Sequence, residues 1–458
     1  MSKIFEYTFS YSLAKKYLLF GFRQFYGEFI VNGKENLPTD DSAVIFAPNH
    51  LNALMDALAV SSLVPSRKAV IYLARADFFA NKTLAKIMNF AKIMPAFRMR
   101  DGFENLGKNA QVFHKCIEVM RFGHAVCMMP EGGQGEERKI RPLVKGIFRL
   151  AFEAQQEFGK SKKVKIVPIG IYLSDLVKSG KQIVINIGKP IDVMDYTGEF
   201  YRNQAVALND IKDELRQQLS DLTLDLATSE NYETFESITD IMAEEYVETA
   251  EKKNVTYEKF KLRQQAAHTL VEIERTEPQL MSELNRLNAD YQSLLKRLYF
   301  KSSVFSQSKS DDTSSLRFLS LLLTFPIALF GFITNVLPTF VPVWIRKASG
   351  IDYSGFHSSI HFGLGMILFP VFYILQAVLF HVTLSSNWGM TLIFLLMQFF
   401  IRQFTLKWYS NFKKYLHKLS FNGLLVAKLE LSSVLYRLID IRNKIVYLIH
   451  TKNRENHA

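Results

Sequence analysis

A histidine and an aspartate lie six residues apart near the N-terminus, in the stretch Ala47–Leu58, APNHLNALMDAL. An imidazole is largely neutral near pH 7, so His50 can take a proton from a hydroxyl that attacks an acyl carbon. Asp56 can accept a hydrogen bond from the other ring nitrogen, which fixes the tautomer and stabilises the imidazolium. No Ser or Cys nucleophile lies beside the pair in the sequence. The attacking hydroxyl is therefore expected to belong to a substrate.

The two side chains cannot share one face of a helix, because residues six apart on an α-helix differ by about 240° in azimuth. We therefore expect His50 in a turn after an apolar strand, with Asn52 as N-cap. Ala53–Val60 would then form the helix that carries Asp56 back to the imidazole. Taken alone, a single histidine after a strand is equally compatible with an ordinary loop residue.

A second apolar run, Ile93–Gly102, IMPAFRMRDG, delivers two arginines at its end. The guanidinium groups of Arg98 and Arg100 could grip a phosphate bidentately, which lysine does less well. The alternative is a solvated strand edge.

A third block, Ala125–Gly146, opens with an apolar run and turns at Pro130. Glu131 is followed by Gly132 and Gly133, where backbone amides can approach an anion because no side chain intervenes. Four basic residues follow in the same loop: Arg138, Lys139, Arg141 and Lys145. The alternative is a basic surface turn.

The fourth block, Val164–Leu173, is an apolar run of the kind found in buried strands, and it contains Pro168 and Gly170. In this order, the four blocks resemble the phospholipid/glycerol acyltransferase superfamily, which includes glycerol-3-phosphate and lysophosphatidate acyltransferases. The resemblance covers residues 25–195. It implies catalysis by the His/Asp block, acceptor-phosphate binding by the arginine and Pro-Glu-Gly blocks, and an acyl or acceptor pocket shaped by Val167–Gly170.

The resemblance thus assigns catalysis to His50 and Asp56 and substrate binding to Arg98, Arg100, Glu131, Gly132, Gly133, Arg138, Lys145 and Pro168. It implies no metal and no cofactor beyond acyl-CoA or acyl carrier protein as co-substrate. Two departures from the common family pattern resemble the fungal glycerol-3-phosphate/dihydroxyacetone-phosphate acyltransferases. Leu51–Met55 place five residues between His and Asp instead of four, and Gly133, Gln134 and Gly135 replace Thr-Arg-Ser.

Short apolar runs alternate with helical patterns through the first half of the chain, which predicts an α/β fold with a mostly parallel sheet flanked by helices. All four blocks are expected at or beside strand carboxyl ends, where such folds bind ligands. The predicted strands are Ala43–Ala47, Val70–Ala74, Ile93–Phe97, Ala125–Met129, Lys165–Ile171 and Ile183–Ile187.

The domain boundaries follow from composition along the 458 residues. We expect an interfacial membrane helix in residues 1–30, for which an ordinary core helix is the alternative, and the acyltransferase-like α/β domain in 31–196. A charged helical arm (197–305), a linker (306–317), a transmembrane or re-entrant region (318–404) and an amphipathic C-terminal helix (405–458) follow. The last helix would lie on the membrane surface or pack on the arm.

Three apolar runs carry the membrane prediction: Phe318–Ile345, Ile360–Phe380 and Trp388–Ile401. Prolines interrupt the first run, and basic residues flank it on both sides. A re-entrant hairpin followed by a crossing pair would place every basic cluster on the cytoplasmic side. Buried core helices are the alternative.

The net charge of +12 suits anionic phospholipid surfaces and the phosphates of CoA. It is not accompanied by a nucleic-acid-binding pattern, so no nucleic-acid partner is expected. Cys116 and Cys127 are the two cysteines, too few for a disulfide framework.

Together, these features predict a membrane-bound enzyme with its catalytic domain on the cytoplasmic side. It would transfer a fatty acyl group to the sn-1 position of glycerol 3-phosphate or dihydroxyacetone phosphate. Three alternatives remain open: sn-2 acylation of lysophosphatidate, remodelling of another lysophospholipid, and a catalytically silent membrane scaffold that binds partners through the arm. Intact His50, Asp56 and Glu131 speak against the scaffold.

Overall fold

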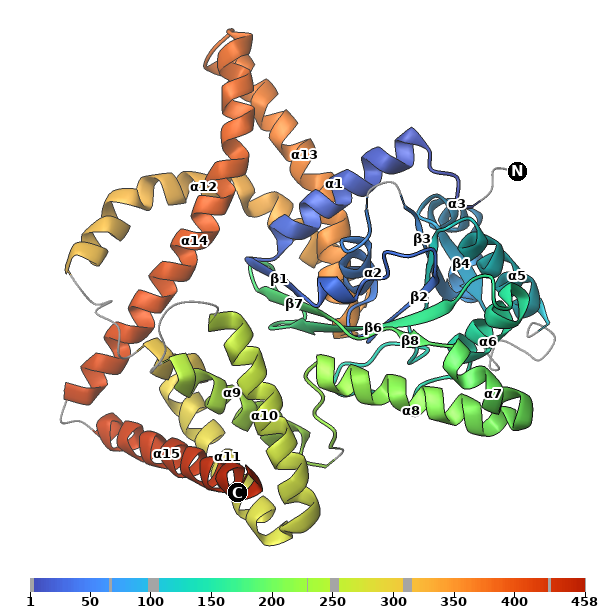
Figure 1. Ribbon diagram of the computed structural model, residues 1–458. Helices are drawn as coiled ribbons and strands as arrows, with labels where there is room; N and C mark the ends of the chain where they lie inside the picture. The colour runs from blue at the N-terminus through green and yellow to red at the C-terminus, as the bar shows by residue number, and fades with distance from the viewer. Residues whose placement is uncertain are drawn as a thin grey trace. The chain divides into compact units, whose positions relative to one another are not determined.

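The computed structural model describes residues 4–65, 68–97, 107–228, 230–247, 255–307, 315–426 and 430–457 (Figure 1). The chain forms two compact units. The first consists of residues 1–225 together with the short segment 352–362, and the second of residues 226–351 and 363–458. Arg98, Arg100 and most of the predicted linker lie outside the described residues.

The first unit is built on an eight-stranded sheet with the order β1-β7-β6-β2-β5-β3-β4, and β8 pairs with β6. All pairings are parallel except those of β6 with β7 and with β8, which confirms the predicted mostly parallel sheet. The two short strands β1 and β8 were not predicted. The strands are β1 (Glu28–Asn32), β2 (Ala43–Pro48), β3 (Val70–Arg75), β4 (Ile93–Ala96), β5 (Ala125–Cys127), β6 (Val164–Leu173), β7 (Gln182–Ile187) and β8 (Ile191–Asp192).

Helices flank this sheet, and their apolar faces build the core with β2, β3, β5 and β6. Helix α8 shows how: Ala207, Ile211, Leu215 and Leu219, spaced four apart, are fully buried. The helical arm was predicted from residue 197, but residues up to 225 belong to the first unit, because this stripe packs on the core. The helices are α1 (Phe9–Phe25), α2 (Ala53–Ser61), α3 (Lys82–Phe90), α5 (Lys108–Arg121), α6 (Gly146–Phe158), α7 (Met194–Arg202) and α8 (Gln204–Leu222).

The fourth sequence block, Val164–Leu173, forms the whole of β6. Pro168 pairs with Ala47 of β2, one position before the last pair of the two strands, Pro48 with Ile169. Gly170 is needed for close packing, because a Cβ there would lie 2.3 Å from the carbonyl oxygen of Leu222. Pro168 therefore lies beside the carboxyl end of β2, and the block itself runs to the end of β6, which agrees with the expectation that the blocks lie at or beside strand ends.

The second unit contains a helical bundle in which α15 (Glu430–His457) packs on the arm helices. Ion pairs join the two: Arg437 to Asp290, and Lys444 to Glu283. Packing on the arm is one of the two placements predicted for the C-terminal helix. Its predicted bounds, 405–458, are wrong, because residues 405–426 belong to α14 (Trp388–Val426) and α15 begins at Glu430. The arm helices are α9 (Tyr232–Val247), α10 (Val255–Thr276) and α11 (Pro278–Leu298).

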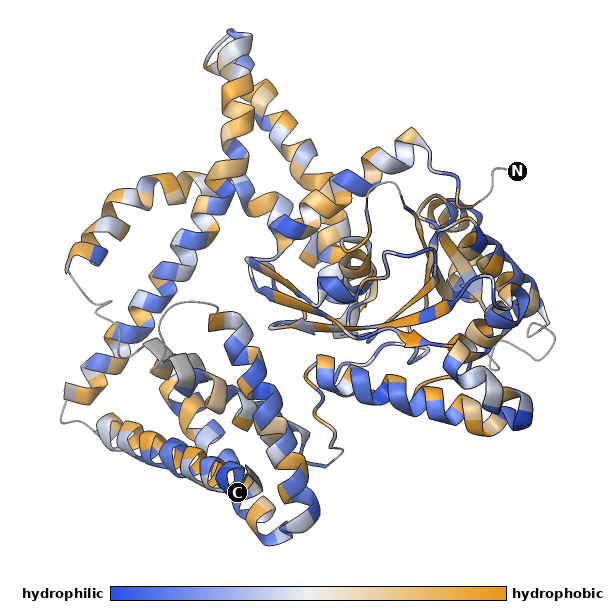
Figure 2. Ribbon diagram, viewed as in Figure 1, coloured by the Kyte–Doolittle hydropathy of each residue, from blue (hydrophilic) through white to orange (hydrophobic). Residues whose placement is uncertain are grey.

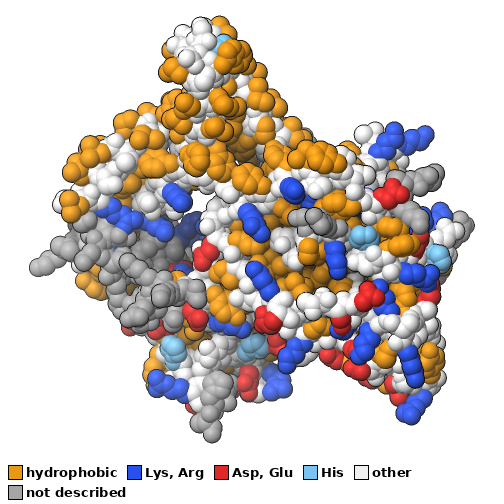
Figure 3. Space-filling model, turned by 45° about the horizontal axis from the view of Figure 1, so that its top comes forward, with side chains coloured by type: hydrophobic (Ala, Val, Ile, Leu, Met, Phe, Trp, Pro, Cys, Tyr) orange, Lys and Arg blue, Asp and Glu red, His pale blue; other side chains and the backbone are white. Residues whose placement is uncertain are grey.

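Among the described residues, three helices are long and apolar enough to cross a membrane: Ser315–Ala348, Ser354–Thr383 and Trp388–Leu425. They correspond to α12 (Ser315–Ala348), α13 (His357–Thr383) and α14 (Trp388–Val426), and apolar residues dominate α12, α13 and the first half of α14 in Figure 2. Hydrophobic side chains cover the projecting ends of α13 and α14 in Figure 3.

The re-entrant hairpin predicted for the first apolar run does not form. Instead, α12 is one continuous helix that contains Pro326, Pro338 and Pro342 and bends along its length (Figure 1). A proline removes one helical hydrogen bond and kinks the helix, but it does not have to reverse the chain.

Candidate active site

His50 lies in the turn between β2 and α2, as predicted, and its Nδ1 atom is 3.0 Å from Oδ2 of Asp56. The same carboxylate oxygen accepts the backbone N–H groups of Leu51 (2.9 Å) and Asn52 (2.6 Å). The side chain of His50 is 14% exposed and that of Asp56 is 1% exposed. The imidazole is therefore held by a buried carboxylate while one side of it remains accessible.

Asn52 occupies the predicted N-cap position of α2, but its side chain does not cap the helix. Asp56, in the first turn of α2, instead folds back and accepts the N–H groups of Leu51 and Asn52, which precede the helix. A carboxylate at a helix N-terminus is also favoured by the helix dipole. Asp56 thus holds both the turn before the helix and the histidine.

Glu131 connects the third sequence block to the histidine. It follows β5, its side chain is 1% exposed, and its Oε1 accepts the backbone N–H of His50 at 2.8 Å. Its Oε2 accepts the backbone N–H of Arg141 at 3.2 Å and the Nε of Arg141 at 3.0 Å. Burial raises the pKa of Glu131, and the charge and hydrogen bonds of Arg141 oppose this shift. Both oxygens are engaged within the protein, so Glu131 positions His50 and Arg141.

Arg141, one of the four basic residues of the loop but not among the predicted binding residues, forms an ion pair with Glu131. Besides Glu131, it donates from Nη1 to the carbonyl oxygen of Gln134, while Nη2 is buried and has no hydrogen-bond partner among the described residues. The glycine loop makes room for it, because a Cβ on Gly135 would lie 3.2 Å from Nε. Gly132 has φ +67°, a conformation that favours glycine. The signal in the sequence was a basic residue shortly after a Glu-Gly-Gly turn.

The other predicted binding residues lie in three different settings. Arg138 is buried and donates from Nη1 to the carbonyl oxygen of Leu173 at 2.6 Å, at the end of β6. Lys145 is exposed before the start of α6, and Pro168 is buried inside β6. The structure thus brings His50, Asp56 and the Glu131 turn together, and it places Arg138 against backbone carbonyls. The binding roles of these residues stay predictions.

Cys116 and Cys127 are free and buried, and burial raises the pKa of Cys116 to about 12. In the part of the chain that the structure describes, no group of three or more His, Cys, Asp or Glu residues could hold a metal ion.

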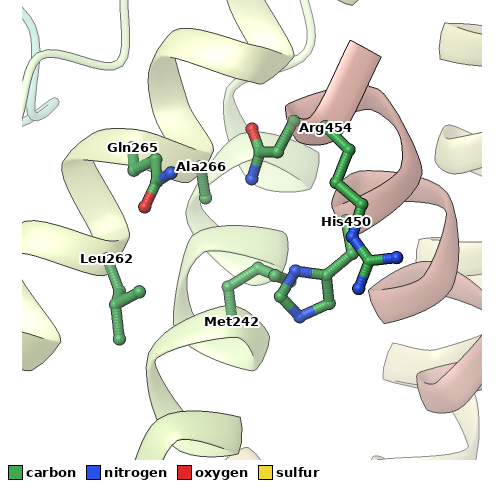
Figure 4. Close-up of a pocket in the computed structure, with 7 residues that line it drawn as sticks. Met242, Leu262, Gln265, Ala266, His450 and Arg454 are labelled. Carbon is green, nitrogen blue, oxygen red and sulfur yellow. The ribbon is translucent and has the colours of Figure 1, made fainter. Parts of the chain in front are cut away.

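A second histidine–carboxylate pair lies in the helical bundle, where Nε2 of His450 is 3.0 Å from Oε2 of Glu245. These side chains are 49% and 31% exposed, so water competes for both groups. His450 lines a cavity of about 400 Å³ in which Met242, Leu262 and Ala266 supply apolar walls (Figure 4). Because it lacks a buried carboxylate, this pair is a weaker candidate for a general base than His50 with Asp56.

Residues 28–172 match the sequence model of the family described as Acyltransferase. This match supports the resemblance of the α/β domain to the phospholipid/glycerol acyltransferase superfamily. This chain is 23% identical to the chloroplastic 1-acyl-sn-glycerol-3-phosphate acyltransferase BAT2 of Brassica napus over 159 aligned residues. The alignment covers 34% of this chain and 41% of the relative. It is 25% identical to tafazzin of Drosophila melanogaster over 157 aligned residues, and this alignment covers 31% of this chain and 38% of the relative.

The chain thus spans about two fifths of the length of these curated relatives. A solved structure, the 1-acyl-sn-glycerophosphate acyltransferase PlsC of Thermotoga maritima, aligns with a TM-score of 0.34 and 15% identity, over 46% of this chain and 79% of that one.

The family match contains all four sequence blocks of the acyltransferase domain except the last residue of the fourth. It ends at residue 172, so α7, α8 and the segment 352–362 are parts of this unit that lie outside the match.

Proposed function

We propose that this chain transfers a fatty acyl group from an acyl thioester to a hydroxyl of a glycerol-phosphate acceptor. The observation that carries the proposal is the His50–Asp56 contact, because it occupies Nδ1 and leaves Nε2 as the ring nitrogen for the substrate. The thioester donor would be acyl-CoA or acyl carrier protein, and no resident cofactor is part of the reaction.

In this reaction, Nε2 of His50 takes the proton of the acceptor hydroxyl while its oxygen attacks the thioester carbon. The new C–O bond forms first, the C–S bond then breaks, and the imidazolium returns the proton to the departing thiolate. Asp56 stabilises the imidazolium between these steps. Products are the acyl ester and the free thiol, so atoms and charge balance.

Arg141 supplies the positive charge for the acceptor phosphate in this proposal. Its Nη2 is buried without a hydrogen-bond partner among the described residues, and it is linked through Glu131 to the backbone of His50. A guanidinium can hold a phosphate while it keeps its bond to the carboxylate, since its five N–H donors point in different directions. Arg98 and Arg100 remain candidates for the same anion.

Two acceptors are favoured by different observations. The extra residue between His50 and Asp56 and the Gly133–Gly135 turn resemble enzymes that use glycerol 3-phosphate or dihydroxyacetone phosphate. The plant relatives are named as 1-acyl-sn-glycerol-3-phosphate acyltransferases, which supports lysophosphatidate.

The test compares purified, detergent-solubilised protein with its His50→Ala variant. Each is incubated with labelled acyl-CoA or acyl carrier protein and, separately, with glycerol 3-phosphate, dihydroxyacetone phosphate or lysophosphatidate. We expect one acceptor to be used by the wild-type protein and to be turned over at least about a hundredfold more slowly by the variant. No turnover of any acceptor, or equal turnover by both proteins, would refute the proposal.

Chain connectivity also supports a membrane topology. Residue 225 and the segment 352–362 belong to the same unit, and α12 is the one candidate span between them in the described residues. Both ends of that stretch must lie on one side of the bilayer, so a single helix cannot cross it there. We therefore propose that α12 is immersed without crossing, that α13 and α14 cross as a pair, and that the catalytic unit faces the cytoplasm.

Single-cysteine labelling in sealed vesicles tests this topology, with Cys116 and Cys127 replaced by alanine. Cysteines at Ser349, after α12, and at the exposed Tyr201 of the catalytic unit should react from the same side. A cysteine at Asn387, between α13 and α14, should react from the other side. Labelling of positions 349 and 201 from opposite sides would contradict the proposal.

A further inference from the structure

The segment 352–362 lies more than 290 residues from the catalytic turn in sequence, and it continues into the apolar helix α13. Within the catalytic unit, Ser358 donates from Oγ to Oδ1 of Asn52 at 2.6 Å. Asn52 is fully buried, and its Nδ2 donates to the carbonyl oxygen of Leu176 at 2.8 Å. Its side chain is thus held from both ends.

The same segment caps the helix that carries Asp56. The N-terminus of α2 has no side-chain cap from its own N-cap residue, and its free N–H groups need acceptors. Asp56 accepts the N–H groups of Leu51 and Asn52, which precede the helix, whereas Oγ of Ser359 accepts the N–H of Leu54, in its first turn, at 3.1 Å. Part of the cap of α2 therefore comes from a distant segment.

Two backbone features show that the segment 352–362 packs closely on the turn before α2 and that the conformation of this turn depends on its neighbours. A Cβ on Gly355 would lie 3.0 Å from the carbonyl oxygen of Leu51, so the two backbones pass in near contact. Ala53 has φ +26°, a conformation that L-residues rarely adopt and that persists when neighbouring contacts enforce it. Ala53 lies directly between Asn52 and Leu54, the two residues that Ser358 and Ser359 hold.

We infer that Ser358 is a positioning residue for the His50–Asp56 pair. Through Asn52, it fixes the backbone N–H groups that hold Oδ2 of Asp56 opposite Nδ1 of His50. The catalytic pair is then aligned only when the beginning of α13 is docked, which links acyl transfer to the position of a membrane helix. This inference rests on the proposed function for its catalytic consequence, but the docking itself can be measured without turnover.

The test uses the full chain and three variants. Ser358→Ala removes the hydroxyl, Ser358→Thr keeps it, and Ser354→Ala is the matched control. Ser354 lies in the same segment, and it contacts Glu136 through its backbone N–H, which alanine retains. Steady-state kinetics give kcat and both KM values, and hydrogen–deuterium exchange reports on the peptide covering residues 50–58.

We expect Ser358→Ala to lower kcat about tenfold, to leave both KM values within about twofold, and to accelerate exchange in residues 50–58, because one buried hydrogen bond is lost. Ser358→Thr should restore most of kcat, and Ser354→Ala should match the wild type. Unchanged exchange of residues 50–58 in Ser358→Ala would overturn the inference. Faster exchange with a kcat equal to that of the wild type would also overturn it, as would an equal effect of Ser354→Ala. If the wild-type protein acylates no acceptor, the proposed function fails and exchange alone decides the docking.

Discussion

Asp56 holds His50 through the same oxygen that holds the turn before helix α2. Its Oδ2 atom lies 3.0 Å from Nδ1 of His50 and accepts the backbone N–H groups of Leu51 and Asn52. The geometry of the His50–Asp56 pair and that of the turn are therefore one structural feature. A change at Asp56 disturbs both.

Asp56→Asn should lower kcat by about a hundredfold to ten-thousandfold, because an amide cannot stabilise the imidazolium as a carboxylate does. The KM values should change far less. Asp41→Asn is the matched control, since Asp41 is 92% exposed and forms a surface ion pair with Lys162. Steady-state kinetics of both variants check the prediction, and Asp56→Asn with a kcat within about threefold of wild type would contradict it.

Arg141→Lys should raise the KM for the phosphate-bearing acceptor about tenfold and change the KM for the acyl donor less. Lysine offers a single ammonium, which cannot keep the contacts with Glu131 and Gln134 and also hold an anion. Initial rates with each substrate varied in turn measure the two KM values. Arg149→Lys, an exposed position on α6, is the control. Equal shifts in both KM values would show that Arg141 does not recognise the acceptor.

The local part of the site could be predicted from the sequence, because its signals are local. An apolar run, a histidine and an aspartate six residues later defined the strand, the turn and the helix that the structure contains. The contacts of Ser358 and Ser359 could not be predicted in this way. They join residues about 305 positions apart, and no spacing rule connects such residues in a single sequence.

The structure differs from the prediction at the start of the arm and in α12, and in both places the sequence carried competing signals. The charged composition after residue 197 suggested an arm, while the four-residue spacing from Ala207 to Leu219 indicated a helix packed on a core. The prolines of α12 suggested a reversal of the chain. Each proline removes one helical hydrogen bond, but α12 stays continuous, and it packs on α14, where Nε1 of Trp408 donates to the carbonyl oxygen of Leu321.

Glu131 should make folding stability depend on pH. Burial raises its pKa in the folded state above the ordinary value of 4.5, so the folded protein binds this proton more readily than the unfolded chain does. Its contribution to stability is therefore fully present below pH 4.5 and is lost as the pH rises through the raised pKa. The thermal midpoint of the wild type minus that of Glu131→Gln should increase as the pH is lowered from 7 toward 4.5.

Thermal unfolding in detergent across this pH range measures the difference, with Glu35→Gln at an exposed position as control. The control should give a difference that varies less with pH. A wild-type advantage that shrinks on acidification would mean that the ion pair with Arg141 outweighs burial, and that the pKa of Glu131 is lowered.

Gly331 should be required where α12 packs on α14 in the second unit. A Cβ there would lie 2.0 Å from Oγ1 of Thr405 and 2.6 Å from Cγ2 of Ile401, so any side chain must push the helices apart. Overpacking of this kind typically costs about 1–3 kcal/mol. Gly331→Leu should therefore lower the thermal midpoint in detergent, whereas Gly423→Leu on α14, where a Cβ meets no atom within 4 Å, should not. Equal midpoints for the two variants would mean that α12 and α14 are not held in this close contact.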